Sequence, residues 1–269
     1  MILNSALILA GGKGTRFEER TEDLPKPLIP VRGKPILERI IEWLKSNGVT
    51  NIIIGVAYKK EMIMNYFGDG SDFGVRINYV EHSQEGGTED AFKTDIEQVF
   101  EKGLINEENF YAMNGDQITD LQLEGLTNAH LRNSPIVTLV SVKLKTNFGV
   151  INLNDRSQVI EFKEKGEVHD KMINSGIYVF NKKIKDYLEG ENIEENAFRK
   201  LIKEGKIYSF YYDGVWLTVN DKNELKKAEE FVKDFDVLNI KNSKNLEFGG
   251  SKEKEVIEKI RNVLNELVK

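Results

Sequence analysis

The amino-terminal part of the chain combines glycines with cations in a spacing suited to holding phosphate groups. An apolar run, Ala6 to Ala10, is followed by glycines at positions 11, 12 and 14. A strand that leads into a glycine-rich turn presents backbone N–H groups to phosphate oxygens. Arg16 adds a planar fork, and Lys13 and Lys26 add compact charges on long stems. This stretch is therefore interpreted as a phosphate cradle.

Two better-known phosphate loops are excluded by spacing. A P-loop requires Gly, four residues and then Gly-Lys-Ser/Thr, and no such string follows Gly11 or Gly12. The dinucleotide fingerprint requires a third glycine where this chain has Phe17. Lys26 instead lies between two prolines, whose restricted φ partly pre-sets its position. A glycine turn with several cations suits a triphosphate.

A carboxylate later in the chain stands where α/β sheets bind ligands. The apolar strand pattern over 110–113 ends in Asn114-Gly115-Asp116. The carboxyl end of a central parallel strand is the ligand side of such a sheet, and a carboxylate there suits a hard divalent cation. Asp116 is therefore a candidate metal ligand.

The segments that must position these residues alternate between helix and strand patterns. Apolar residues at helical spacing predict a helix from Ile36 to Leu44, and a β-branched run predicts a buried strand over 51–57. A helix over 59–67 and a strand over 75–80 follow. This alternation predicts a parallel sheet covered by helices on both faces.

Composition bounds the class of protein. The 269 residues allow a sizeable core, and the absence of cysteine excludes disulfides and thiolate metal sites. No apolar run is long enough for a membrane span, so we expect a cytoplasmic protein without a membrane partner. The net charge is −6, with 38 Lys and Arg dispersed among 44 Asp and Glu, which argues against a nucleic-acid partner.

The order of the motifs resembles that of the sugar-phosphate nucleotidyltransferases. The glycine turn continues as Thr15-Arg16 and is followed by Pro25-Lys26-Pro27, which is similar to the signature of that family. The resemblance covers about residues 3 to 235. It implies a three-layer Rossmann-like, GT-A-like fold with a mixed, mostly parallel sheet and a carboxyl-terminal helical extension.

The resemblance also implies where the nucleotide binds. In the family, the loop after the third strand contacts the base, and glycine leaves room for the flat ring. Glu89 stands where the family has a small residue; it could accept hydrogen bonds from guanine or simply favour the helix dipole. The implied nucleotide-binding residues are Leu9, Ala10, Gly11, Gly12, Gly14, Thr15, Arg16, Lys26, Glu81, Gly86, Gly87 and Thr88.

Three later segments resemble the family's sugar-binding elements. They are Phe148-Gly149-Val150, the Val-x-x-Phe-x-Glu-Lys element that ends at Lys165, and the Asn-x-Gly-Ile-Tyr element that begins at Asn174. The last of them is predicted to be a strand over Asn174 to Phe180. The family follows that lysine with Pro, whereas this chain has Gly166. The implied sugar-binding residues are Asn114, Gly115, Gly149, Glu164, Lys165, Asn174 and Gly176.

By the same resemblance, Arg16, Lys26, Asp116 and Lys165 are the catalytic residues and Mg²⁺ is the cofactor, held by Asp116. Thr218 stands where the family has a metal-binding Asp, and it offers a neutral oxygen in place of a charge. No histidine lies in a motif, and a phosphomonoester is already a nucleophile near neutral pH.

The implied reaction joins an NTP and a sugar 1-phosphate to give an NDP-sugar and pyrophosphate. The best match is GTP with mannose 1-phosphate or another hexose 1-phosphate, although U, dT or C stays open as the base. The alternatives are cytidylyl transfer to a non-sugar phosphate and a non-catalytic protein that binds nucleotide sugars and regulates a partner.

The domain organisation predicted from the sequence has three parts. Residues 1–235 form the nucleotidyltransferase domain, 236–250 a polar linker, and 251–269 an amphipathic helix. The apolar stripe on the last helix indicates that one face of this helix is buried, either against its own domain or against a neighbouring copy. A homo-oligomer is therefore left open.

Overall fold

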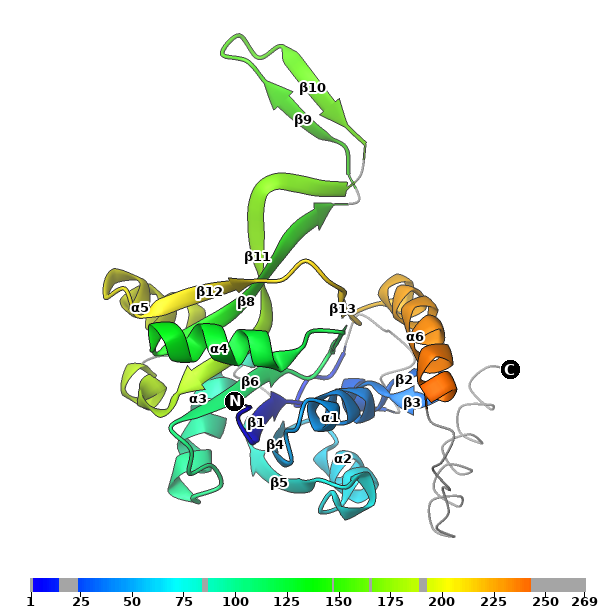
Figure 1. Cartoon of the computed structure of the whole chain (residues 1–269), viewed down its shortest axis with the longest axis vertical. Helices are drawn as coiled ribbons and strands as arrows, with labels where there is room; N and C mark the ends of the chain where they lie inside the picture. The colour runs from blue at the N-terminus through cyan, green and yellow to red at the C-terminus, as the bar shows by residue number, and fades with distance from the viewer. Residues whose placement is uncertain are drawn as a thin grey trace.

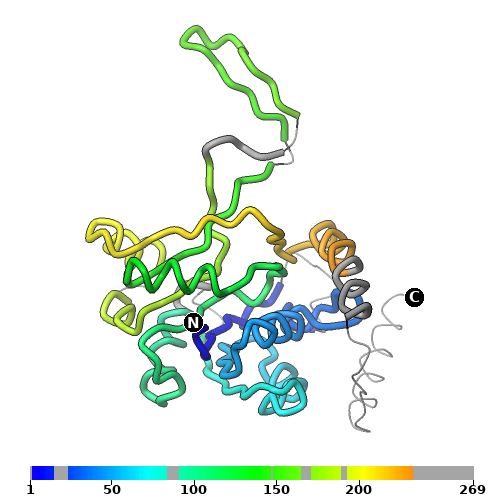
Figure 2. Tube along the Cα trace, viewed as in Figure 1, coloured from blue at the N-terminus to red at the C-terminus, as the bar shows by residue number. Residues whose placement is uncertain are grey.

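The computed structural model describes the backbone of residues 2–14, 24–83, 87–146, 148–164, 166–188 and 193–242 (Figures 1 and 2). The strands are β1 Ser5–Leu9, β2 Pro30–Val31, β3 Lys34–Pro35, β4 Asn51–Val56, β5 Arg76–Glu81, β6 Asn109–Asn114, β7 Gln117–Thr119, β8 Val137–Thr146, β9 Val150–Leu153, β10 Val159–Lys163, β11 Gly166–Asn181, β12 Ile207–Tyr211 and β13 Trp216–Thr218. The α-helices are α1 Ile36–Ser46, α2 Lys60–Phe67, α3 Gly87–Glu101, α4 Leu123–Asn133, α5 Arg199–Lys203 and α6 Lys222–Asn242. Short helical turns are η2 Lys26–Leu28, η3 Ser71–Phe73, η4 Lys182–Tyr187 and η5 Ile193–Phe198.

A mixed sheet forms the centre of the fold, with its strands in the order β12-β8-β11-β6-β1-β4-β5. The pairs β1–β4, β1–β6, β4–β5 and β8–β12 are parallel. Strand β11 runs antiparallel to both of its neighbours, β6 and β8. The expected three-layer, mostly parallel α/β fold is confirmed.

Helices cover both faces of the sheet, and successive side chains of a central strand pack into the two different cores. On β1, Ile8 faces the core formed with α1, α2, α4 and α6. Its neighbours Leu7 and Leu9 face the other core, formed with α3, α5, η4 and η5. Successive side chains of a strand point to opposite faces, so a strand buried on both sides must be apolar throughout. This accounts for the apolar run from Ala6 to Leu9 in β1 and for most of β4.

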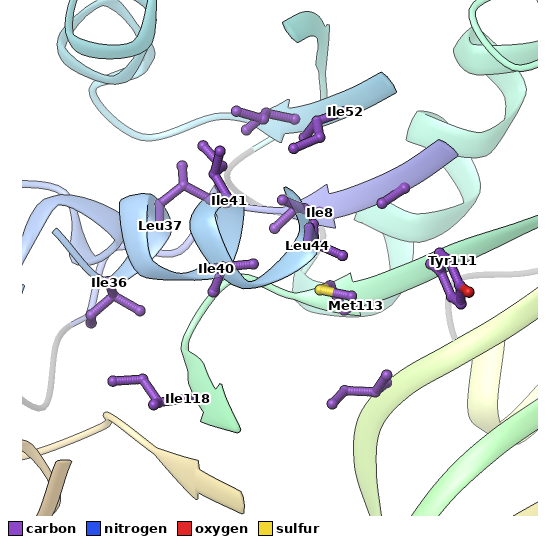
Figure 3. Packing of buried hydrophobic residues seen from close by; sticks show 14 of the residues in the cluster. Ile8, Ile36, Leu37, Ile40, Ile41, Leu44, Ile52, Tyr111, Met113 and Ile118 are labelled. Atoms are coloured by element: carbon purple, nitrogen blue, oxygen red, sulfur yellow. The ribbon is translucent and has the colours of Figure 1, made fainter. Parts of the chain in front are cut away.

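Helix α1 packs against the centre of the sheet through the stripe seen in its sequence. Its buried residues, spaced as helical neighbours, lie over Ile8, Ile52 and Met113 (Figure 3). The helix ends at Ser46 with Asn47 as its C-cap, and the following Gly48 adopts a positive φ of 85°, a conformation that favours glycine. The α1 residues that form this stripe are Ile36, Leu37, Ile40, Ile41 and Leu44.

Two features differ from the predicted boundaries. Helix α6 continues to Asn242, so residues 236–242, expected in the linker, are helical. Strand β11 begins at Gly166, well before the expected start at Asn174, because its first half pairs with the extended end of β8. The helix expected over 251–269 lies outside the described residues.

Strands β9 and β10 form a separate two-stranded sheet that projects from the body of the protein (Figure 1). Their pairing places Ile151 opposite Phe162, both about half exposed. Within the described parts of the chain, no helix has the length and apolar character needed to cross a membrane.

Candidate active site

The carboxyl ends of β1 and β6 lie side by side and bring the glycine turn next to the Asn114-Gly115-Asp116 segment. Leu9 pairs with Asn114 in the parallel register. The Gly115 N–H donates to the Leu9 carbonyl at 2.8 Å, and a Cβ at Gly115 would press against that oxygen. Gly115 is thus required for the close packing of the two turns. As a result, Asp116 emerges beside the phosphate loop.

Lys26, Asp116 and Asn220 converge on one point at this edge of the sheet. Lys26 Nζ donates to Asp116 Oδ2 at 2.5 Å and to Asn220 Oδ1 at 2.7 Å. The side chains of Lys26 and Asp116 are 11% and 27% exposed. The lysine begins η2, directly after Pro25, whose φ of −66° starts the turn. The sequence predicted Lys26 and Asp116 as site residues, and the structure joins them to a residue from a third segment.

The loop after β13 holds Asn220 in place. Strand β13 pairs with β7, and the Val219 N–H donates to the Asp116 carbonyl at 2.9 Å. Glu224, in the first turn of α6, accepts from the Asn220 N–H at 2.8 Å and from Thr218 Oγ1 at 2.9 Å. The carboxylate of Glu224 therefore fixes this loop and engages the hydroxyl of Thr218.

Two of these oxygens suit a magnesium ion. Asp116 Oδ2 and Asn220 Oδ1 both lie within hydrogen-bond distance of Lys26 Nζ, so they point toward a common position. A carboxylate and an amide oxygen are hard ligands, and Mg²⁺ fills the rest of its octahedron with phosphate oxygens and water. In the part of the chain that is described, no group of three or more His, Cys, Asp or Glu is arranged for a metal. The donor set therefore fits a metal that is held jointly with a phosphorylated substrate.

A polar group beside this cluster lacks a partner. Asn114 Oδ1 is buried, and it has no hydrogen bond among the described residues. Such orphaned acceptors are rare in protein interiors. The neighbouring Gly176 has φ of +76°, and a Cβ there would overlap the Asn114 carboxamide. Gln117 Nε2 anchors this turn by donating to the Gly176 carbonyl at 3.0 Å. The acceptor capacity of Asn114 Oδ1 is therefore unused among the described residues.

Asn174 is engaged within the protein. Its Oδ1 accepts from the Gly176 N–H at 3.1 Å, and its Nδ2 donates to Tyr178 Oη at 2.7 Å and to Glu194 Oε1 at 2.9 Å. Burial raises the pKa of Tyr178, which keeps its hydroxyl neutral. Asn174 therefore shapes the Gly176 turn in this structure.

The described residues of the glycine turn are tied to β4. The Ala10 N–H donates to the Gly55 carbonyl at 2.7 Å, and the Gly11 carbonyl accepts from the Tyr58 N–H at 3.4 Å. Leu9 and Ala10 are buried, whereas no atom of the described residues lies within 4 Å of a Cβ built at Gly12. Gly14 has φ of 70°. The start of the turn is thus fixed by backbone hydrogen bonds.

Other predicted residues lie apart from this cluster. Glu81 ends the edge strand β5 and pairs with Lys60 at 2.5 Å on the surface. Gly149 and Glu164 flank the β9–β10 hairpin, which forms a sheet of its own. Gly87 begins α3. The remaining predicted site residues lie outside the described residues, wholly or in their side chains: Thr15, Arg16, Gly86, Thr88 and Lys165.

A hollow of about 270 Å³ lies next to the Thr218 segment, between β8, β13 and α6. Lysines from β8 and α6 line it together with Trp216 and Leu217. The lysines are Lys143, Lys145 and Lys227, of which Lys143 pairs with Asp213 at 3.1 Å. Two carboxylates, Asp213 and Glu224, line it as well, so the three lysines leave the lining with an excess of one positive charge.

Sequence reasoning missed Asn220 and Glu224. Asn220 follows the short apolar run Val215 to Val219, and Glu224 lies four residues further, at the start of a helix. A polar residue between a strand and a helix is a signal for the ligand edge of a sheet, but it is also common in ordinary caps. Only the contact with Lys26 distinguishes the two.

Comparison with known proteins places these motifs in a family. The sequence matches the family described as nucleotidyl transferase over residues 5–234. A bifunctional protein GlmU from Methanocaldococcus jannaschii is 36% identical over 237 residues, which are 85% of this chain and 54% of that protein. The chain thus spans about half the length of the GlmU proteins that it resembles.

Relatives of similar length are also found. A D-glycero-alpha-D-manno-heptose 1-phosphate guanylyltransferase from Aneurinibacillus thermoaerophilus is 32% identical over 230 residues, which are 84% of this chain and 96% of that protein. The crystal structure of HddC from Yersinia pseudotuberculosis matches with a TM-score of 0.66 and 26% identity, and the match covers 86% of this chain and all of that one.

Proposed function

Because the chain belongs to the nucleotidyl transferase family, we propose that it transfers a nucleotidyl group from an NTP to a sugar 1-phosphate. The observation that carries the proposal is the convergence of Lys26, Asp116 and Asn220 beside the glycine turn. A cation and hard oxygens at the carboxyl ends of parallel strands are suited to charged phosphates.

The chemistry is an in-line displacement. An oxygen of the sugar phosphate forms a bond to the α-phosphorus of the NTP, while the bond from that phosphorus to the bridging oxygen of the β-phosphate breaks. Pyrophosphate leaves with that oxygen and its electron pair. A phosphate monoester is largely ionised at neutral pH, so no general base is needed, and catalysis consists of positioning and charge stabilisation.

The proposed roles of Lys26, Asp116 and Asn220 are supported by their mutual contacts. Lys26 binds phosphate oxygens once it exchanges its contacts with Asp116 and Asn220 for them. These two oxygens would then hold Mg²⁺, which neutralises charge on the triphosphate. The glycine turn binds phosphates through its N–H groups. Arg16 and Lys165, which lie outside the described residues, are proposed to contact the leaving pyrophosphate and the incoming phosphate.

The acceptor is proposed to lie on the side of Asn114. The unpartnered Oδ1 of Asn114 is proposed to accept from a sugar hydroxyl, and Gly176 lets the Asn114 carboxamide lie where a Cβ would overlap it. The lysines of the neighbouring hollow attract the acceptor phosphate. GTP is the proposed donor and a hexose or heptose 1-phosphate the proposed acceptor, supported by the named activity of the guanylyltransferase relative. The cytoplasm, where NTPs are made, is the proposed location.

The test is pyrophosphate release from each NTP, with and without Mg²⁺, over a panel of hexose and heptose 1-phosphates. Turnover of one pair would support the proposal and identify the base and the sugar. If no pair releases pyrophosphate but an NDP-sugar binds, the protein is a binding protein and the proposed reaction is wrong. Turnover of CTP with a phospho-alcohol alone would replace the sugar acceptor.

A further inference from the structure

A histidine and an aspartate form a buried pair directly behind the phosphate loop. His82 Nδ1 lies 3.0 Å from both carboxylate oxygens of Asp95. The side chains are 6% and 0% exposed. His82 follows β5, and Asp95 lies in the middle of α3, so the pair joins two elements on the nucleotide side of the sheet. Within the described residues, the hydrogen bonds of the ring involve Nδ1 alone.

The pair rests on two glycines. A Cβ at Gly55, in β4, would overlap the Asp95 carboxylate, and a Cβ at Gly11 would overlap Nε2 of His82. Glycine inside a strand commonly marks such a close approach, which explains the interruption of the β-branched run of β4. The imidazole therefore stands against the backbone of the first glycine of the phosphate turn.

Stability does not account for this pair. The neighbouring inward residues of α3, Phe92 and Ile96, are apolar and fully buried, so Asp95 is the exception on that face. Burial raises the pKa of Asp95, although the contact with His82 opposes this shift. A buried polar pair of this kind is often no more stable than apolar side chains of similar volume. Apolar residues at these two positions would not provide an imidazole ring in a fixed orientation.

We propose that His82, oriented by Asp95, is a positioning residue that sets the Gly11-Gly12 turn for the phosphates of the NTP. This inference rests on the proposed function. Asp95 accepts from Nδ1–H and fixes the tautomer and the plane of the ring, as a carboxylate does for other histidines. The ring then limits how far the backbone of Gly11 can move toward His82, and the Tyr58 N–H holds the Gly11 carbonyl. The turn is held from both sides before the nucleotide arrives.

The first test replaces the pair with apolar residues in the full chain. His82→Leu combined with Asp95→Leu is expected to fold with a thermal midpoint near that of the wild type. Its KM for the NTP is expected to rise at least about tenfold, because a displaced turn misplaces the bound phosphates. The KM for the sugar phosphate and kcat are expected to change little. Asp95→Asn, which retains a hydrogen bond to the ring, is expected to lie between this variant and the wild type.

A second buried histidine provides the matched control. His130 bonds to Thr138 Oγ1 at 2.9 Å and to Asn109 Oδ1 at 3.0 Å, near the opposite ends of the strands. His130→Gln is expected to alter stability without raising the KM for the NTP. An unchanged KM in the doubly substituted variant, or an equal rise in His130→Gln, would overturn the positioning role.

A double-mutant cycle at Gly11 and His82 tests the contact between these two residues. It also tests the proposal if the variant with two leucines does not fold. Gly11→Ala is expected to weaken NTP binding, and adding His82→Ala is expected to recover part of that loss, because it removes the two ring atoms that lie nearest to the added methyl group. Additive losses would contradict the contact. Binding is measured by calorimetry, separately from turnover. If the wild type binds no NTP, the proposed function fails. If it binds and turns over while the variants match it, only this inference fails.

Discussion

Replacing Asp116 with asparagine is expected to remove most of the activity while preserving the fold. In the wild type, Asp116 Oδ2 accepts from Lys26 Nζ at 2.5 Å, in a setting where the lysine is 11% exposed. Asparagine keeps the shape of the side chain but removes its charge. The proposed metal ion would then lose its charged ligand, and Lys26 would keep only the neutral oxygen of Asn220.

The magnitudes follow from this geometry. Loss of one preorganised charged group at a phosphoryl-transfer site costs roughly 3 to 4 kcal/mol of transition-state stabilisation, which is about 10² to 10³ in kcat/KM. The ion pair is neither fully exposed nor fully buried, so its loss lies between the values for those classes, at about 2 kcal/mol. In a chain of this size that lowers the thermal midpoint by roughly 4 to 8 °C.

The assay is Mg²⁺-dependent pyrophosphate release, with thermal unfolding measured on the same preparations. The control is Asp120→Asn, four residues along the chain, where the carboxylate accepts from the Val215 N–H at 2.8 Å and from Tyr212 Oη. The amide oxygen of asparagine can still accept, so activity is expected to stay within about threefold. The reasoning is refuted if Asp116→Asn keeps more than a tenth of the wild-type activity, or if the control loses as much.

Three further substitutions test other parts of the structure. Burial lowers the pKa of His130 to about 4. Between about pH 6.5 and 4, His130 is therefore protonated in the unfolded chain but not in the native state. The free energy of unfolding should fall by up to about 3 kcal/mol as the pH drops through that window. The free energy of unfolding, measured with urea between pH 7 and 4.5, should change less with pH in His130→Gln than in the wild type. An identical pH dependence in the two proteins would contradict this. Gly176→Ala should lower the free energy of unfolding by at least about 2 kcal/mol and raise the KM for the sugar phosphate, because φ is +76° and the added methyl group would overlap Asn114. Unchanged kinetics and unchanged unfolding would exclude a role for that turn. Thr218→Asp should destabilise the protein by about 1 to 2 kcal/mol, since its carboxylate would face Glu224; a tighter Mg²⁺ dependence without loss of stability would instead place residue 218 in the metal shell.

Local patterns in the sequence were sufficient for most of the fold. Helix α1 and strand β4 follow from periodicity over a few residues, and the structure places them close to the predicted limits. Strand β11 was predicted too short, because its first half depends on pairing with β8 and not on its own pattern. Residues 236–242 read as a polar linker, yet α6 runs through them. Polar composition does not exclude helix, so that boundary was not available from the sequence.

The sequence by itself determined the family and the α/β class and predicted Lys26 and Asp116 as site residues, because glycine spacing, prolines and strand-end carboxylates are local signals. The tertiary structure alone decided what these residues meet. Lys26 and Asn220 are 194 positions apart, and they touch because β13 pairs with β7 at the edge where β1 and β6 end. The pairing of His82 with Asp95 likewise depends on α3 packing behind the glycine turn. Convergence of side chains is a property of strand order and helix packing, which patterns along the chain do not encode residue by residue.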